Sequence, residues 1–310
     1  MKKQLLIIAA SLSLMPVGNL FAVQNQTFIK STETLIAKNI SHSNHNESLM
    51  EKGDKKYKSK DYKGAITDYS KILINNPNDF HALFQRALAK SYLNDHVGAI
   101  KDYTKAIEID PEYASAFYNR GLSKDKIDDD YGAISDFNKA IAIDGKHQKA
   151  YIYRGYAKSD IGDHEGAVKD LTAAIEIKPE DAYGYSARGY VKERAGDYYA
   201  AISDYSKAIK IDPDDYYSFA GRGYAKGQIG DNKGAIIDFT KAIEINPDDS
   251  YSFFGRGVIN KISGNYDLAC NDWIKSSDLG YEGADKKANE CKNTDNVKKN
   301  IQELLSSQNY

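Results

Sequence analysis

Apolar and polar positions along this chain follow one pattern that repeats every 34 residues. Its clearest marker is an alanine, which recurs at Ala65, Ala99, Ala133, Ala167, Ala201, Ala235 and Ala269. A large apolar or aromatic residue follows each alanine by four positions, at Tyr69, Tyr103, Phe137, Leu171, Tyr205, Phe239 and Trp273. A period of this length is typical of a repeat array, in which each unit buries its apolar face against its neighbours.

Each unit has the apolar spacing of two helices. In the sixth copy, one helical face runs from Phe219 to Ile229 and a second from Ala235 to Ile245. Between them lies Gly230-Asp231, where glycine can end the first helix in a left-handed conformation and aspartate can cap the second. Pro247 ends the second helix because proline has no N–H to donate. The pattern therefore predicts a helix–turn–helix unit in every copy.

The unit resembles the tetratricopeptide repeat (TPR). The resemblance is carried by the alanine, the aromatic residue after it, the closing proline and a glycine in the first helix, at Gly121, Gly155, Gly189, Gly223 and Gly257. It implies an all-α fold, a right-handed α-solenoid of about seven 34-residue helix–turn–helix repeats with a C-terminal capping helix. It also implies that the first helices line a concave groove, and that peptides or proteins bind there.

Changes in composition divide the chain into four parts. Residues 1–22 place Lys2 and Lys3 before an apolar run, as in a secretory signal peptide, with an uncleaved membrane anchor as the alternative. Residues 23–45 are polar and predict a flexible linker, residues 46–283 form the seven-repeat solenoid, and residues 284–310 form the capping helix and tail. The ending resembles that of bacterial exported TPR proteins. We therefore expect an exported protein, periplasmic or otherwise extracytoplasmic, that meets a membrane only through an uncleaved N-terminal segment.

Charged residues occupy matching columns of the two helices. The first helices carry Arg120, Arg154, Arg188 and Arg222, followed one turn later by Lys158, Lys192 and Lys226, and the second helices carry Asp136, Asp170, Asp204 and Asp238. We predict a structural ion-pair ladder, in which each aspartate is held by a cation of its own or the adjacent repeat. The alternative is that the basic column receives an acidic ligand, but the matched numbers favour internal pairing.

Tyrosines dominate the expected groove in the C-terminal half of the array. If the first helices line it, as the resemblance implies, the lining comprises Tyr156, Tyr183, Ser186, Ala187, Tyr190, Tyr217, Ala220, Gly221, Tyr224, Tyr251, Phe254, Gly255 and Val258. A tyrosine ring suits both peptide backbones and sugar rings, although any single ring could instead pack between helices. Asn119 and Lys149 are also candidate groove residues, from an incomplete version of the carboxylate clamp that some family members use.

The sequence contains two cysteines, Cys270 and Cys291, on either side of an expected helical hairpin that turns at Leu279-Gly280. An antiparallel hairpin brings these two positions together, and an exported protein meets an oxidising compartment. We predict a disulfide that holds the cap, with two reduced, buried cysteines as the alternative.

The chain shows no catalytic constellation. It lacks a phosphate-binding glycine loop, and His42 and His45 have no third metal ligand at a suitable spacing. A net charge of -2 argues against nucleic-acid binding, which requires a basic surface. We therefore predict a non-enzymatic scaffold, without cofactor or metal, for a protein or peptide partner. Glycan or cell-wall binding in the same groove and self-association into a homo-oligomer are the alternatives.

Overall fold

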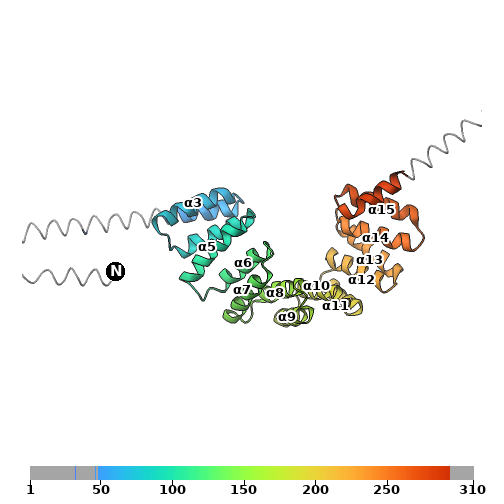
Figure 1. The fold of residues 1–310 in the computed structure, drawn as a ribbon, viewed down its shortest axis with the longest axis horizontal. Helices are drawn as coiled ribbons and strands as arrows, with labels where there is room; N and C mark the ends of the chain where they lie inside the picture. Colours follow the sequence, from blue (N-terminus) through green and yellow to red (C-terminus); the bar gives the residue numbers. More distant parts are fainter. Residues whose placement is uncertain (1–31, 33–45, 47, 294–310) are drawn as a thin grey trace, which may run out of the picture. The chain divides into compact units, whose positions relative to one another are not determined.

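The structure, a computed structural model, describes residues 32, 46 and 48–293. All regular structure within these residues is helical, and consecutive helices pair into an all-α solenoid (Figure 1). The predicted signal peptide (1–22), all of the predicted linker but residue 32, and the tail beyond residue 293 lie outside the described residues. In the part that is described, no helix combines the length and apolar character needed to cross a membrane.

The chain divides into two compact units, residues 1–109 and residues 110–310. The described part of the first unit contains a helical segment over residues 48–58, followed by three helices, α3 (Tyr62–Asn75), α4 (Phe80–Tyr92) and α5 (His96–Ile109). The second unit contains α6 (Ala114–Asp125), α7 (Asp130–Ile143), α8 (Gln148–Asp160), α9 (His164–Ile177), α10 (Ala182–Arg194), α11 (Tyr198–Ile211), α12 (Tyr216–Gln228), α13 (Asn232–Ile245), α14 (Ser250–Ile262), α15 (Tyr266–Asp278) and η1 (Glu282–Ala284).

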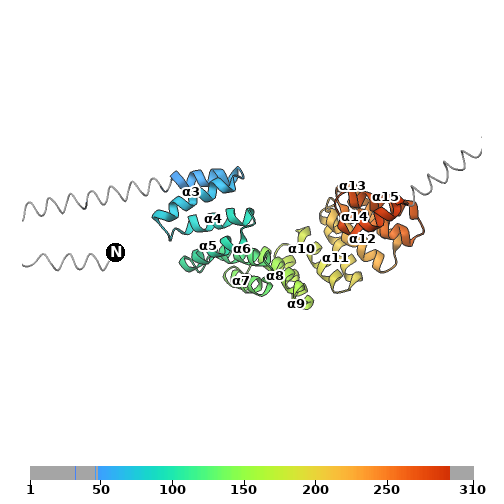
Figure 2. The ribbon, with the colours of Figure 1, turned by 45° about the horizontal axis from the view of Figure 1, so that its top comes forward.

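In the second unit consecutive helices pack against one another from α6 through to α15 (Figure 2). The first helices of neighbouring repeats also touch directly, because α10 contacts both α8 and α12, and α12 contacts α14. After η1 the chain is helical again over residues 285–293, the segment that the sequence marks as a cap. The first helices of successive repeats therefore form one continuous layer of this unit.

The predicted glycine–aspartate turn is confirmed. Gly162 ends its helix at φ 86°, and Asp163 then accepts a hydrogen bond from the backbone N–H of Gly166 at 2.9 Å. Three earlier repeats place other residues at the left-handed position, where Lys60, Asn94 and Asp128 have φ values of 64°, 61° and 60°. The left-handed turn is therefore common to the repeats, and glycine supplies it without strain only in the later ones.

The repeating alanines and large residues form the core. All seven alanines from Ala65 to Ala269 have no exposed surface. The glycines of the first helices face the large residue of their own repeat, and a Cβ added at Gly189 would lie 3.0 Å from Tyr205 Cδ1. The TPR glycine is thus a packing requirement, since it allows the two helices of a repeat to approach around a bulky ring.

The charged columns meet as ion pairs within each repeat. Arg188 donates from Nε and Nη2 to the two carboxylate oxygens of Asp204, both at 2.8 Å, and Lys192 Nζ lies 2.7 Å from Asp204 Oδ2. The same bidentate contact joins Arg86 to Asp102, Arg120 to Asp136, Arg154 to Asp170, Arg222 to Asp238 and Arg256 to Asp272. In four of these repeats a lysine forms a second ion pair with the same aspartate, namely Lys90, Lys124, Lys158 and Lys226.

Five of these arginines are also seen to contact the preceding repeat. Arg188 Nη1 donates to Thr172 Oγ1 at 3.0 Å, and equivalent contacts run from Arg86 to Ser70, Arg154 to Asn138, Arg222 to Ser206 and Arg256 to Thr240. The hydrogen bond to Asp204 raises the pKa of Arg188 above its ordinary value, although burial opposes this. These cations are occupied by the protein's own acceptors, which leaves the alternative of an acidic ligand on this column without support.

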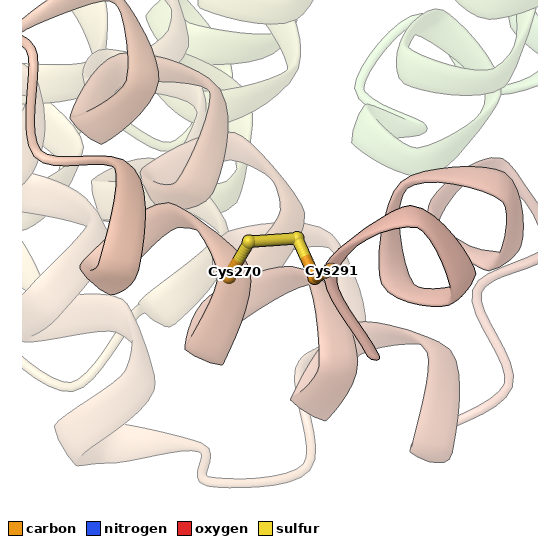
Figure 3. Close-up of a disulfide and its surroundings, with 2 residues drawn as sticks. All are labelled: Cys270 and Cys291. Carbon is orange, nitrogen blue, oxygen red and sulfur yellow. A yellow bond between two sulfur atoms is a disulfide. The ribbon is translucent and has the colours of Figure 1, made fainter. Parts of the chain in front are cut away.

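The last repeat is joined to the C-terminal segment by a disulfide. Cys270 in α15 and Cys291 in the helical segment 285–293 are bonded, with Cα atoms 5.5 Å apart (Figure 3). Both cysteines are buried beside Ala269 and Trp273 in one apolar cluster. The bond therefore attaches the segment that covers this end of the second unit.

Candidate functional site

A groove of about 1120 Å³ lies on the second unit, lined by residues of α6, α8, α10, α11, α12 and α14 and of the loops that precede α10, α12 and α14. Five of the predicted tyrosines line it, and we call this surface the tyrosine groove: Tyr156, Tyr183, Tyr190, Tyr217 and Tyr251. Ser186, Ala220 and Gly221 lie among them, as expected for the first-helix face. Tyr153 of α8 adds a sixth ring.

Most of these rings are open to solvent. Tyr183, Tyr190, Tyr217 and Tyr251 are exposed, and Tyr217 has 68% of its surface accessible. Among the five predicted tyrosines Tyr156 is the exception, because it packs edge-on against Tyr183 and Tyr190 with ring centroids 6.5 and 6.1 Å away. Its burial raises the pKa of the Tyr156 hydroxyl above the ordinary value. Packing between helices therefore accounts for Tyr156, and not for the exposed row beside it.

Several residues expected in the lining lie elsewhere. Tyr224 packs edge-on against Tyr198 of α11 at 6.4 Å, and Phe254 lies against Tyr281 at 4.9 Å. Ala187 is buried, whereas Gly255 and Val258 face the core rings of Phe239 and Trp273. Asn119 donates its side-chain N–H to the Ser115 carbonyl at 2.7 Å, and Lys149 is exposed outside the groove. The clamp residues are thus not brought together with the tyrosines.

Sequence reasoning missed the base of the tyrosine groove, where Tyr205 and Glu193 meet. Tyr205 is a core residue, only 3% exposed, but its hydroxyl end lies in the groove lining. Gly221 makes this possible, because a Cβ there would lie 2.4 Å from Tyr205 Cζ. The Tyr205 hydroxyl donates a hydrogen bond to Glu193 Oε2 at 2.9 Å.

Glu193 has an unusual carboxyl group. Burial raises the pKa of Glu193 to about 7, and the hydrogen bond from Tyr205 only partly opposes this shift. The residue lies in the last turn of α10, where the helix carbonyls present a negative partial charge that disfavours an anion. The groove therefore contains a carboxyl group that titrates near neutral pH.

The rest of the lining is strongly acidic. It contains Asp125, Asp160, Glu180, Asp181, Glu193, Asp212, Asp215 and Asp249, whereas Lys126 is its one basic residue within the described part of the chain. Asp181, Asp215 and Asp249 cap the N-termini of α10, α12 and α14. The repeat therefore places one carboxylate beside the groove at each of these helix starts.

One end of the groove has a closer group of acids. Asp125, Asp130 and Asp160 each offer a carboxylate oxygen within 4.8 Å of the others. Asp160 forms an ion pair with Arg194, and burial raises the pKa of Asp130 above its ordinary value, with the neighbouring carboxylates adding to the effect. The cation in contact with Asp160 is thus a side chain of the protein itself.

Family comparison agrees with this architecture. A TPR repeat model matches residues 92–124, and tetratricopeptide repeat models match residues 154–216 and 216–249. The chain is a tetratricopeptide repeat protein. The comparison with curated proteins finds no match to this TPR protein.

Solved TPR structures share the fold. A tetratricopeptide repeat protein from Parabacteroides merdae is 18% identical over 80% of this TPR protein and 97% of its own chain, with a TM-score of 0.67. The C-terminal part of a TPR repeat-containing protein from Cytophaga hutchinsonii is 19% identical over 75% and 96% of the two chains, with a TM-score of 0.58. The MamA protein is 27% identical over 55% and 93%, with a TM-score of 0.52. These similarities support the α-solenoid architecture.

Proposed function

We propose that this TPR protein is a non-enzymatic scaffold that binds an extended polypeptide segment in the tyrosine groove. The observation that carries the proposal is the row of exposed rings that α10, α12 and α14 present to one groove, at Tyr183, Tyr190, Tyr217 and Tyr251. An exposed tyrosine offers a flat apolar face and a hydroxyl, and such residues supply much of the binding energy of protein interfaces.

The dimensions of the groove favour a chain-like ligand. Its volume of about 1120 Å³ lies at or above the upper end of the range for small-molecule pockets, roughly 300–1,000 Å³. Its lining is drawn from several successive repeats, so a ligand that contacts the whole row must extend along the unit. This shape suits an extended segment better than a compact metabolite.

The side chains of the groove favour binding over catalysis. The described residues that line it include tyrosines, carboxylates and one lysine, but no histidine or cysteine. The Tyr205 hydroxyl donates a hydrogen bond to Glu193 and holds that carboxyl in place. Such a set can orient a ligand through rings and charges, which is the role we assign to it.

We also propose that the protein acts outside the cytoplasm. The basis is the signal-like segment with Lys2 and Lys3, together with the pairing of Cys270 and Cys291, since structural disulfides persist in oxidising compartments. A fusion of residues 1–30 to alkaline phosphatase, which is active only after export, tests this. An inactive fusion that is otherwise well expressed contradicts export.

Binding in the groove is tested with arrays of random dodecapeptides and the full chain. We expect Tyr190→Ala/Tyr217→Ala to lose the peptides that the wild-type protein selects. The matched control is Tyr131→Ala/Tyr199→Ala, because these tyrosines are exposed on the second helices α7 and α11, outside the groove. Selection that survives the groove substitutions contradicts the proposal, and groove-dependent retention on glycan arrays without peptide selection favours a sugar ligand instead.

A further inference from the structure

We propose that the polypeptide held in the tyrosine groove is basic, and that Glu193 receives the cation of one of its lysine or arginine side chains. The inference rests on the proposed function, because it specifies the chemistry of the segment that the groove binds. It is carried by the balance of charge in the groove, by the local environment of Glu193 and by the exposed rings around it.

The charge balance in the groove differs sharply from that of the whole chain. The lining has eight carboxylates and a single lysine, whereas the full sequence has 44 acidic and 42 basic residues. That lysine, Lys126, already lies 3.4 Å from Asp125, and a second of the eight, Asp160, is paired with Arg194. Three more of the acids are helix caps, where the helix dipole offsets part of each charge but not all of it. The groove therefore attracts cations and repels acidic peptides.

Glu193 is a carboxyl group that the fold does not require. The equivalent positions of the other repeats hold Tyr57, Ser91, Asp125, Ser159, Gly227 and Lys261, so the packing of the repeat does not depend on a glutamate there. Glu193 is partly buried, and among the described residues no basic side chain lies within ion-pair distance of it. A partly buried carboxylate without a cationic partner is unfavourable. Burial removes its hydrating water, and no cation takes the place of that water.

Asp204, a carboxylate in the same repeat, has cationic partners that Glu193 lacks. Asp204 is buried and receives both Arg188 and Lys192. Glu193 receives one neutral donor, the hydroxyl of Tyr205. The structure therefore pairs its structural carboxylate fully and leaves the carboxylate of the groove with room for a further donor. A ligand ammonium or guanidinium group would complete it.

The rings beside Glu193 suit the same ligand. Tyr190 lies three residues earlier on α10 and hence on the same helix face, and Arg194 already lies over its ring, 5.8 Å from the centroid. Tyr217 and Tyr251 remain exposed on the next two first helices. Aromatic faces attract cations, and they also pack against the methylene stem of lysine. A basic side chain would thus gain from carboxylate and rings together.

The test uses three pools of random dodecapeptides that share Gly, Ser, Ala, Leu and Tyr and carry either four lysines, four acetyl-lysines or four glutamates. Binding to the full chain is measured by fluorescence polarisation at low ionic strength. We expect the lysine pool to bind and the other two pools to bind at least about tenfold more weakly. Glu193→Gln should weaken lysine-pool binding about tenfold, whereas Glu193→Asp should retain the preference for lysine.

The matched control is Glu176→Gln, which makes the same charge change at an exposed position of α9 outside the groove. It should change the affinity less than about twofold, since an exposed charge at a distance is screened. Circular dichroism and melting curves check that the variants fold. Equal binding of the lysine and acetyl-lysine pools, or unchanged affinity of Glu193→Gln, overturns the inference.

The outcomes separate this inference from the proposed function. If all three pools bind alike and Tyr190→Ala/Tyr217→Ala abolishes their binding, the groove is a peptide site and only its preference for basic segments is wrong. If no pool binds in a manner that depends on those tyrosines, both proposals fail.

Discussion

Tyr205 and Glu193 are joined by a hydrogen bond of 2.9 Å between a core residue of α11 and a groove residue of α10. Tyr205 belongs to the column that fills the interior of each repeat, yet it reaches the groove because Gly221 leaves space for its hydroxyl end. The packing of one repeat thus positions the carboxyl group that we assign to ligand binding. Any change to this contact should affect stability and binding together.

The first prediction concerns the pH dependence of stability. In the folded protein burial raises the pKa of Glu193 to about 7, from an ordinary value of 4.5 for the free side chain. The folded state therefore binds the proton more tightly than the unfolded state, and the free energy of unfolding falls as the pH rises between these values. The Glu193→Gln protein has no carboxyl to ionise at this position, so its free energy of unfolding should not fall in this way. It should be more stable than the wild type by about 1–3 kcal/mol at pH 8, and equally stable near pH 4.

The groups that face Glu193 from neighbouring helices support this direction. They are the hydroxyls of Tyr205 on α11, Tyr224 on α12 and Tyr251 on α14, and none of them is cationic. Urea unfolding of the wild type, Glu193→Gln and the control Glu176→Gln at a series of pH values measures the effect. A Glu193→Gln difference that is the same at pH 4 and pH 8 would show that the carboxyl titrates normally.

The second prediction concerns Gly221. An alanine in a helix usually stabilises it by about 1 kcal/mol relative to glycine. Here Gly221→Ala should instead destabilise the protein by about 1–3 kcal/mol, because the new Cβ would lie 2.4 Å from Tyr205 Cζ. It should also weaken lysine-peptide binding, since Tyr205 must move away from Glu193.

Gly145→Ala is the control for Gly221→Ala, because no atom lies within 4 Å of a Cβ added at that position. Its melting temperature should stay close to that of the wild type. A Gly221→Ala protein that is as stable as Gly145→Ala would mean that Tyr205 does not occupy the space over Gly221.

The third prediction concerns the ion-pair ladder. Asp204→Ala removes a buried carboxylate and leaves Arg188 and Lys192 without their shared partner. Loss of one member of such a pair costs about 3–5 kcal/mol when fully buried, so we expect roughly 2–4 kcal/mol here, where the cations are partly exposed. Asp214→Ala, at an exposed loop position, should lower the melting temperature far less. Similar melting temperatures for the two variants would refute a stabilising ladder.

The fourth prediction concerns the C-terminal disulfide. Cys270→Ser/Cys291→Ser should destabilise the last repeat by about 3 kcal/mol, because a closed loop of 21 residues no longer restricts the unfolded chain. The loss should be local, since repeats contact only their neighbours. Hydrogen exchange should therefore quicken in α15 and in residues 285–293, and remain unchanged in α8 and α9. Alkylation of the unreduced wild-type protein that labels both cysteines would contradict the bond.

Much of the fold follows from the sequence because its main features recur at the same spacing in most or all of the seven repeats. The alanine and ring columns identify the core, and the Gly162-Asp163 turn identifies the helix boundary. The register of sixteen residues between Arg188 and Asp204 returns in every complete pair. Because the same local interactions recur every 34 residues, the sequence leaves few alternatives for how the helices pair.

The groove was harder to predict from the sequence, because its lining consists of the side chains that neighbouring repeats leave exposed. Tyr190 and Tyr224 occupy equivalent positions, but only Tyr190 lines the groove, since Tyr224 packs against Tyr198. Glu193 has the sequence context of a solvated last-turn residue, and its burial arises only in the assembled unit. The available signal was its departure from the small residues Ser159 and Gly227 in the same column.

Site-directed photocrosslinking tests the central claim most directly, because it reports where a bound peptide lies. A benzophenone amino acid replaces Tyr217 in the groove or Tyr199 on the opposite helix layer, two positions with similar exposure of 68% and 74%. With the lysine peptide pool, we expect strong crosslinking from position 217, loss of that crosslinking in the Glu193→Gln background, and background yield from position 199. Equal crosslinking from the two positions would contradict the account.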